Sequence, residues 1–115
     1  MRHWLFRTTP AVYDIRRRLG ASDPMLPWLV RQHKDKIGVG DLGFLWVGGT
    51  LDSQAIVGAV RVAGPPSVFS VPETDLAYWP TPSPEPAERV LCEIVNRGPE
   101  VKWQEIMEMP EMIDH

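Results

Sequence analysis

The sequence is poor in the side chains that most catalytic and metal chemistries need. It has one cysteine, Cys92, and three histidines, His3, His33 and His115. One cysteine cannot form an internal disulfide, and the few histidines show neither metal-ligand spacing nor the zinc-deaminase signature. A glycine-rich phosphate loop and a G-x-S-x-G nucleophile turn are also missing. These absences argue against an enzyme and predict no catalytic residue, metal or cofactor.

Long apolar runs are missing as well. No stretch approaches the ~18 apolar residues that a membrane-spanning helix needs, and no secretory hydrophobic region opens the chain. With the lone cysteine, this predicts a cytoplasmic protein without a membrane partner. The length of 115 residues, with 43% hydrophobic and 23% charged residues, predicts one globular domain over residues 1–115.

The charges are unevenly distributed. Residues 1–62 hold nine Lys and Arg against five Asp and Glu, whereas residues 63–115 hold three against ten. A positive first half attracts phosphate groups, but a net charge of −3 argues against tight nonspecific binding to nucleic acid. Charge alone does not separate a binding face from an ordinary solvated surface.

Twelve prolines and nine glycines favour short strands and loops over long helices. Aromatic, β-branched or continuous apolar runs predict strands at residues 3–6, 42–47, 55–62 and 89–95, with the second and third forming an antiparallel hairpin. Gly38, Gly40 and Asp41 mark a turn before this hairpin. Residues 72–86 predict an extended proline-rich connection, and residues 101–109 a helical turn or two.

One early helix is predicted between the first two strands. Thr9 is placed to cap it, Pro10 suits its first position, and Gly20 supplies the stop. Apolar residues at 12, 15 and 19 share one face. The expected fold class is therefore α+β and mainly β, with short strands forming a small, partly open barrel.

An ordered set of residues in the first half is more specific than any single motif. In chain order it reads Trp4-x-Phe6, Pro10-x-x-Tyr13-Asp14-Ile15, Trp28, Ile37-x-x-Gly40-Asp41, Leu45-Trp46, Gly49 and Ile56-x-Gly58. This set resembles the EVE domain family, which belongs to the PUA-like superfamily and is related to YTH domains. The resemblance covers residues 3–63 and extends loosely through Tyr78-Trp79 and residues 89–95.

The resemblance implies a PUA-like pseudo-barrel of about five or six mostly antiparallel strands with one or two flanking helices. It also implies a binding module that reads a modified, typically methylated, base flipped out of DNA or RNA into an aromatic-walled pocket. Restriction or RNA-modification proteins are the partners implied. EVE domains continue past the position of Ile113 with a strand and a helix, so a truncated or minimal domain, or completion by another subunit, is expected.

Two tryptophans are the candidate walls of the pocket. Trp28 lies in the apparently irregular segment 21–41 and matches the family's pocket tryptophan; it either stacks on a base or anchors a loop. Trp46 is either a second wall or a core residue, because strand alternation places it with Phe44 on one face of an apolar strand. Trp4 and Phe6 are predicted as core.

Polar groups complete the candidate site. Arg7, Thr8 and Thr9 end the first strand, and Gly48 and Gly49 allow close backbone approach; these five form the predicted polar rim.

Arg31, His33 and Lys34 follow Trp28 and are predicted to contact phosphate or to be solvated. The alternative function is a PUA-like small-molecule or protein-interaction module without nucleic-acid binding. The oligomeric state is left open.

Overall fold

The computed structural model describes residues 2–30, 33, 35–49, 54–80, 82 and 86–102. Over these residues, seven strands and two short helices confirm the predicted mainly β, α+β class. The elements are β1 (His3–Thr8), α1 (Ile15–Leu19), β2 (Met25–Leu29), β3 (Leu42–Val47), β4 (Ala55–Val62), β5 (Ser67–Phe69), the 3₁₀ helix η1 (Glu73–Tyr78), β6 (Ala87–Asn96) and β7 (Val101–Lys102). The number of strands exceeds the expected five or six because it includes β5 and β7, which are only three and two residues long.

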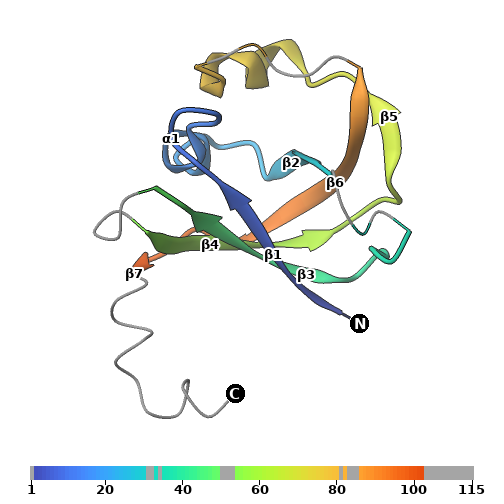
Figure 1. Ribbon diagram of the computed structural model, residues 1–115, viewed down its shortest axis with the longest axis horizontal. Coiled ribbons are helices and arrows are strands. Elements are labelled where there is room, and N and C mark those ends of the chain that lie inside the picture. Colours follow the sequence, from blue (N-terminus) through green and yellow to red (C-terminus); the bar gives the residue numbers. More distant parts are fainter. Residues whose placement is uncertain are drawn as a thin grey trace.

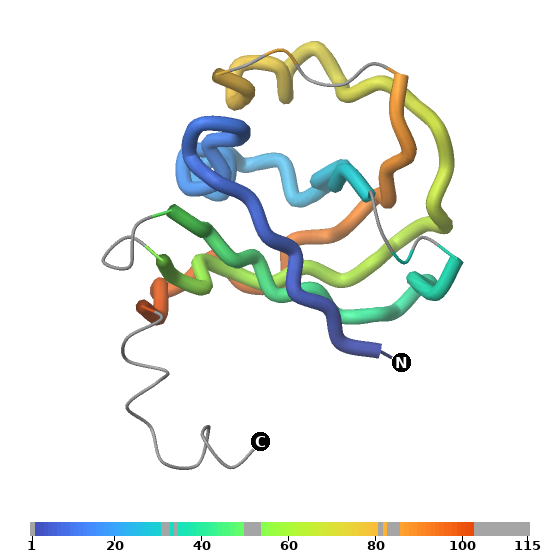
Figure 2. The backbone as a smooth tube through the Cα atoms, viewed as in Figure 1, coloured from blue at the N-terminus to red at the C-terminus, as the bar shows by residue number. Residues whose placement is uncertain are grey.

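The strands form one mixed sheet in the order β1-β3-β4-β6-β2, with β5 beside β6 and β7 beside β4 (Figure 1). Only β1 and β3 pair in parallel among the described strands; the other pairs are antiparallel. The sheet curls without closing into a barrel, as the backbone trace shows (Figure 2). Its two end strands therefore approach each other: Phe6 of β1 and Trp28 of β2 stack with ring centroids 5.5 Å apart.

The predicted hairpin is confirmed with its predicted bounds. β3 and β4 pair antiparallel, with a register shift between Leu45 and Trp46. Leu45 and Val47 are fully buried, whereas Phe44 and Trp46 on the opposite face are half-buried. This alternation is the one that a strand with two different faces requires.

The N-terminal helix begins later than predicted. Its cap is Asp14, whose carboxylate accepts a hydrogen bond from the Arg17 N–H at 3.3 Å. Thr9 does not cap it, because its carbonyl accepts from the Val12 and Tyr13 N–H groups and closes a turn before the helix. Gly20 ends the helix as predicted.

Trp28 lies in a strand, which corrects its expected place in an irregular segment. Pro24 and Pro27 suggested a loop, but the hydrogen bonds of β2 explain how a proline fits. The Val30 N–H donates to Glu88 and the Pro24 carbonyl accepts from Ile94, so alternate residues of β2 face β6. Pro27 lies between these positions and faces the open side, where its missing N–H costs the sheet nothing.

Two further expectations, both for the second half of the chain, are corrected by the structure. The connection over residues 72–86 is not wholly extended, because it contains η1. Val101 and Lys102 form β7 instead of starting a helical turn, and residues 103–109 lie outside the described part of the chain.

The buried core joins all the long strands to α1. Leu26, Leu45, Val60, Val90 and Cys92 show no exposed surface. Burial raises the pKa of the Cys92 thiol to about 12, so this side chain acts as a small apolar core residue. None of the helices in the described residues has the length and apolar character needed to cross a membrane.

Candidate functional site

A pocket of about 620 Å³ lies between β1 and β2, the two ends of the curled sheet. Residues 4–9 form one side and residues 27–30 the other. Connecting segments complete the lining with Val12, Tyr13, His33, Ile37 and Trp79. The volume is within the range of small-ligand sites. The pocket exists because the sheet does not close.

Aromatic rings form one continuous wall of this pocket. Phe6 stacks on Trp28, with an interplanar angle of 13°. Tyr13 meets Trp28 edge-on, with centroids 6.3 Å apart, and lies 5.0 Å from the Trp79 ring. Trp28 is 9% exposed, so it both packs in the core and borders the pocket. Trp28 is therefore a core residue of β2, not a loop anchor, and its place at the pocket is the one that the base-stacking alternative requires.

A second aromatic pair lies on the same pocket. The half-buried Trp4 ring is 5.7 Å from the imidazole of His33, with the planes tilted by 31°. His33 is exposed and adopts a φ of 59°, in the left-handed region. Trp4 therefore does more than fill the core, which was its predicted role.

The backbone of β1 offers hydrogen-bonding groups to the pocket. Leu42 N–H donates to Arg2 and Gly48 N–H donates to Thr8, so the even-numbered residues of β1 face β3. In a parallel ladder the intervening residues, Leu5 and Arg7, direct their N–H and C=O groups the other way. Both line the pocket. Among the described strands, β1 pairs only with β3, so these edge groups have no strand partner.

The facing edge of β2 is complementary. The alternation set by Pro24 and Val30 leaves the Pro27 carbonyl and both backbone groups of Leu29 on the open side. Pro27 and Leu29 line the pocket as well. Donors and acceptors at fixed positions therefore border the pocket from two strands.

Asp41 holds the Trp4 ring in place. Its carboxylate accepts hydrogen bonds from the Trp4 Nε1 at 2.9 Å, the Arg2 N–H at 3.0 Å and the Gly38 N–H at 2.9 Å. The Arg2 N–H, followed by the Trp4 and Gly38 donors, lowers the pKa of Asp41 to about 2. The predicted turn residue thus also ties the start of β1 to the loop before β3.

This arrangement predicts an acid-sensitive element. Because the folded pKa is depressed, the contribution of Asp41 to stability is complete above the unfolded pKa of about 3.9 and is lost as pH falls toward about 2. Carboxyl-detected NMR should place the Asp41 midpoint near 2. The Asp41→Asn variant has no carboxylate to protonate here. Its free energy of unfolding should therefore fall less between about pH 4 and pH 2 than that of the wild type. A midpoint near 3.9 in the folded protein would contradict the assignment.

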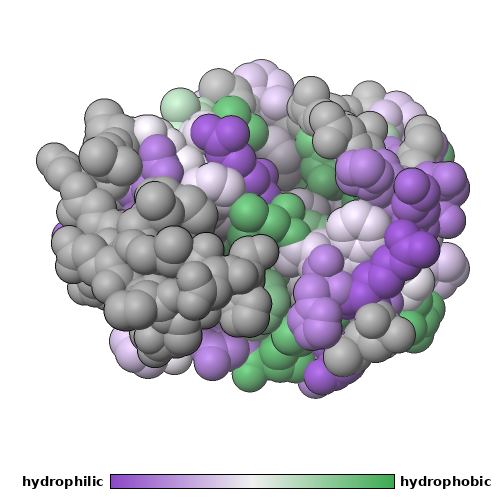
Figure 3. Space-filling view, turned by 60° about the horizontal axis from the view of Figure 1, so that its bottom comes forward, coloured by the Kyte–Doolittle hydropathy of each residue, from purple (hydrophilic) through white to green (hydrophobic). Residues whose placement is uncertain are grey.

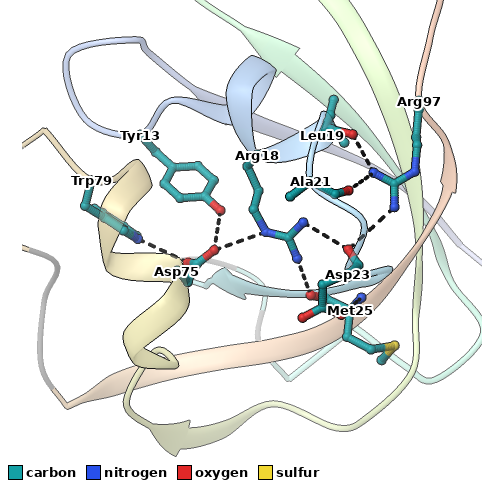
Figure 4. A network of polar contacts seen from close by, with 9 residues as sticks. All are labelled: Tyr13, Arg18, Leu19, Ala21, Asp23, Met25, Asp75, Trp79 and Arg97. Atoms are coloured by element: carbon teal, nitrogen blue, oxygen red, sulfur yellow. Dashed lines mark hydrogen bonds and ion pairs between the residues drawn. The ribbon is translucent and has the colours of Figure 1, made fainter.

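Asp75 of η1 holds the other end of the aromatic wall (Figure 4). Its Oδ1 accepts from the Tyr13 hydroxyl at 2.9 Å and from the Arg18 Nε at 3.2 Å, and its Oδ2 accepts from the Trp79 Nε1 at 3.4 Å. Asp75 and Arg18 are each 4% exposed at the side chain. Burial, with the Asp75 charge second, raises the pKa of Tyr13, so its hydroxyl stays protonated and donates.

Arg18 extends this network to β2. Its guanidinium donates to the carbonyls of Asp23, at 3.0 Å, and Met25. The helix, η1 and the start of β2 are thereby joined through one buried ion pair (Figure 4). The polar network therefore positions both Tyr13 and Trp79 in the pocket wall.

The structure brings together only part of the predicted site. Trp28, Arg7, Thr8, Thr9 and His33 line the pocket.

Trp46, Gly48 and Gly49 do not line it. Trp46 pairs with Arg7 in the parallel register, and both side chains point to the other face of the sheet. Arg31 and Lys34 lie outside the described residues.

Four aromatic residues of the pocket lining were not predicted as site residues: Trp4 and Phe6, which were assigned to the core, and Tyr13 and Trp79. Tyr13 had a signal in the sequence, since it belongs to the motif set that carries the family resemblance. Trp79 had a weaker signal, because it belongs only to the loose extension of the resemblance and follows a short 3₁₀ helix in a proline-rich segment without periodicity. No group of three or more His, Cys, Asp or Glu side chains within the described part could hold a metal ion.

Comparisons with known proteins support the fold. No protein-family model matches the chain, and no curated protein matches its sequence. Among solved structures, it is similar to protein Atu2648 from Agrobacterium tumefaciens, with a TM-score of 0.64 and 17% identity. The alignment covers 99% of this chain and 75% of the Agrobacterium protein. At this identity, the similarity shows a shared fold and assigns no family or function.

Proposed function

We propose that this chain is an EVE-like member of the PUA-like superfamily that binds a modified base flipped out of DNA or RNA. The base would occupy the pocket between β1 and β2. The observation that carries this proposal is the combination, in one pocket, of a continuous aromatic wall and two strand edges that have no partner strand within the described residues. The family resemblance over residues 3–63 supports it.

Stacking supplies the first part of the binding energy. A nucleobase is flat, and the rings of Trp4, Trp28 and Trp79 border a pocket with room for it. Base–aromatic stacking contributes about 1–3 kcal/mol per base. Taking a base out of a duplex costs a few kcal/mol, so stacking alone roughly offsets that step.

The strand edges supply recognition. The backbone groups of Leu5, Arg7 and Leu29 present both donors and acceptors to the pocket. The edge of a base carries both kinds of group, so one base matches these positions and another leaves a buried group unpaired. An unsatisfied buried polar group costs about 1–3 kcal/mol, which gives useful discrimination.

A methyl group on the base would contact apolar lining. Val12, Val30 and Ile37 border the pocket beside the aromatic rings. Removing one methyl from water contributes about 0.8 kcal/mol, which is only a few-fold in affinity. Strong selectivity for a methylated base therefore requires the strand-edge hydrogen bonds as well.

Charge motivates the alternative function. The net charge of −3 is unfavourable for binding a polyanion, and the pocket has the size of a small-ligand site. A planar small molecule would use the same rings and the same backbone groups.

The predicted phosphate contacts belong to the nucleic-acid proposal. His33 lines the pocket, and Arg31 and Lys34, near it in the sequence, stay predicted phosphate contacts.

Replacing Trp28 should test the pocket directly. Trp28→Leu is expected to weaken binding of a methylated nucleoside by about 5- to 150-fold, which corresponds to the stacking energy. The measurement is isothermal titration with methylated and unmodified nucleosides. Trp46→Leu is the matched control, because this tryptophan is outside the pocket and should leave nucleoside binding unchanged.

A second variant guards against loss of packing, since Trp28 also belongs to the core. Val12 is 42% exposed and lines the pocket, so the larger side chain of Val12→Trp should fill the pocket without removing a core contact. This variant should therefore also weaken nucleoside binding. Thermal unfolding checks that each variant is folded. If folded wild-type protein binds neither nucleosides nor single-stranded oligonucleotides at low salt, the proposal is wrong. Binding of small heterocycles without oligonucleotides would select the alternative.

A further inference from the structure

The face of the sheet opposite the pocket carries its own ordered set of side chains. Because partners in a pleated sheet point to the same side, the register of β1 and β3 places Leu5 beside Phe44 and Arg7 beside Trp46. Arg61 of β4 joins them, because Leu42 is the register partner of both His3 and Arg61. We call this surface the outer face, defined by His3, Leu5, Arg7, Phe44, Trp46 and Arg61. Figure 3 shows the side on which β3, β4 and β7 lie, with hydrophobic side chains gathered through its middle and hydrophilic ones beside them.

Aromatic rings on the outer face are paired with other planar side chains. The His3 imidazole stacks on Phe44, with centroids 6.3 Å apart and planes inclined by 12°. The Arg7 guanidinium carbon lies 5.4 Å above the Trp46 ring. Leu5 lies between these two pairs along β1 and is 49% exposed. The outward side of β1 and β3 therefore carries two pairs of planar side chains, with Leu5 between them.

The charged side chains that β1, β3 and β4 themselves place on the outer face are arginines. The sequences of β1, β3 and β4 contain no Asp or Glu, and their ionisable side chains are His3, Arg7 and Arg61. Glu93 of β6 is opposite Arg61 in the register and so points to the same face, and the Arg61 Nη1 donates to the Gly40 carbonyl at 3.0 Å. Arg7 and Arg61 therefore outnumber Glu93 on this face, in a chain whose net charge is −3.

Gly48 makes room for the arginine. A Cβ at this position would lie 2.8 Å from the Arg7 Nε and 3.0 Å from its Nη2. A larger residue would therefore displace the guanidinium from its place above Trp46. This explains the glycine without any contact to the pocket, where Gly48 does not appear.

From these observations we infer that the outer face binds the single-stranded nucleic acid next to the flipped base. The inference rests on the proposed function. Rings and guanidinium planes are the groups on which unpaired bases stack, and an arginine also pairs with phosphate. The excess of arginines over acidic side chains on this face favours a polyanion over an apolar protein segment as the occupant.

β1 connects the two surfaces. Its Leu5 and Arg7 backbone groups border the pocket, while the Arg7 side chain covers Trp46 on the outer face. A strand that crosses the edge of β1 can therefore place one base in the pocket and the next ones on the outer face. The distance from His3 to Arg7 is about 13 Å at ~3.3 Å per residue. This corresponds to about four stacked nucleotides.

The test compares a free modified nucleoside with a single-stranded nonamer that carries the same base at its centre. Gly48→Ala and Phe44→Ala should each weaken nonamer binding at least about fivefold and leave nucleoside binding within twofold of wild type. Gly48→Ala moves only the end of a flexible side chain, so it is expected to fold normally. Arg61→Gln should reduce the salt dependence of nonamer binding. Arg17→Gln is the control, because this exposed arginine is on α1.

The outcomes separate the inference from the proposed function. Unchanged nonamer affinity in folded outer-face variants that still bind the nucleoside overturns the inference and keeps the proposed function. Nonamer binding that depends on the outer face, without any nucleoside binding, supports single-strand binding by the outer face and overturns the base-binding pocket of the proposed function. If sedimentation shows a dimer that Phe44→Ala dissociates, the outer face is a protein interface and the inference is wrong.

Discussion

Asp75→Ala should lower the free energy of unfolding by about 3–5 kcal/mol, the usual effect of removing one partner from a buried ion pair. The substitution leaves the Arg18 guanidinium, which is 4% exposed, without its carboxylate. It also removes the acceptor of the Tyr13 hydroxyl and the Trp79 indole. Urea unfolding followed by fluorescence should show a lower midpoint with little change in slope.

Two controls make this result specific. Glu100→Ala breaks an exposed ion pair with Arg16, whose side chains are 42% and 38% exposed, and should cost no more than about 1 kcal/mol. The double variant Asp75→Leu with Arg18→Met removes both charges and should recover part of the loss, since no buried charge is left unpaired. A cost below about 1 kcal/mol for Asp75→Ala would show that the network does not hold the wall.

Gly58→Ala should be the most damaging single-methyl addition in the sheet. The new Cβ would lie 2.5 Å from the Asn96 carbonyl oxygen and 3.3 Å from the Leu19 Cδ1. The first neighbour is backbone, close to the irregular register between β4 and β6, so it cannot turn aside as a side chain does. We expect a loss of about 1–3 kcal/mol or more in the free energy of unfolding, measured by the same urea titration.

Gly64→Ala is the matched control for this substitution. Its nearest neighbour would be the Leu91 Cβ at 3.9 Å, an ordinary van der Waals contact. It should change stability by no more than about 0.5 kcal/mol. Equal stability of the two variants would mean that β4 shifts to accommodate the methyl group.

The edges of β1 and β2 that have no partner among the described strands link stability to function. An open strand edge is prone to pairing with another chain, and proteins usually protect it. Here the two edges border one pocket, and Pro27 removes one of the donors on the β2 side. A ligand that satisfies the remaining groups would also stabilise the fold, so ligand binding is expected to raise the unfolding temperature.

Local patterns were sufficient for the elements that have one apolar face or a strong stop signal. The apolar runs at residues 42–47 and 55–62 predicted β3 and β4 with their bounds, and Gly20 predicted the end of α1. They failed where local signals compete. Pro27 hid a strand because its missing N–H is harmless only on an edge, and edge position is a property of the whole sheet.

The sequence by itself determined the mainly β class, the central hairpin and the presence of tryptophans suited to a binding site. Only the tertiary structure decided which rings border the pocket. Strand alternation separates Trp46 from Leu45 but does not say which face meets the pocket; the parallel register of β1 and β3 decides that. Likewise, Tyr13 and Asp75 meet across 62 positions of the sequence. Contacts over such separations depend on how the sheet curls, which local periodicity does not encode.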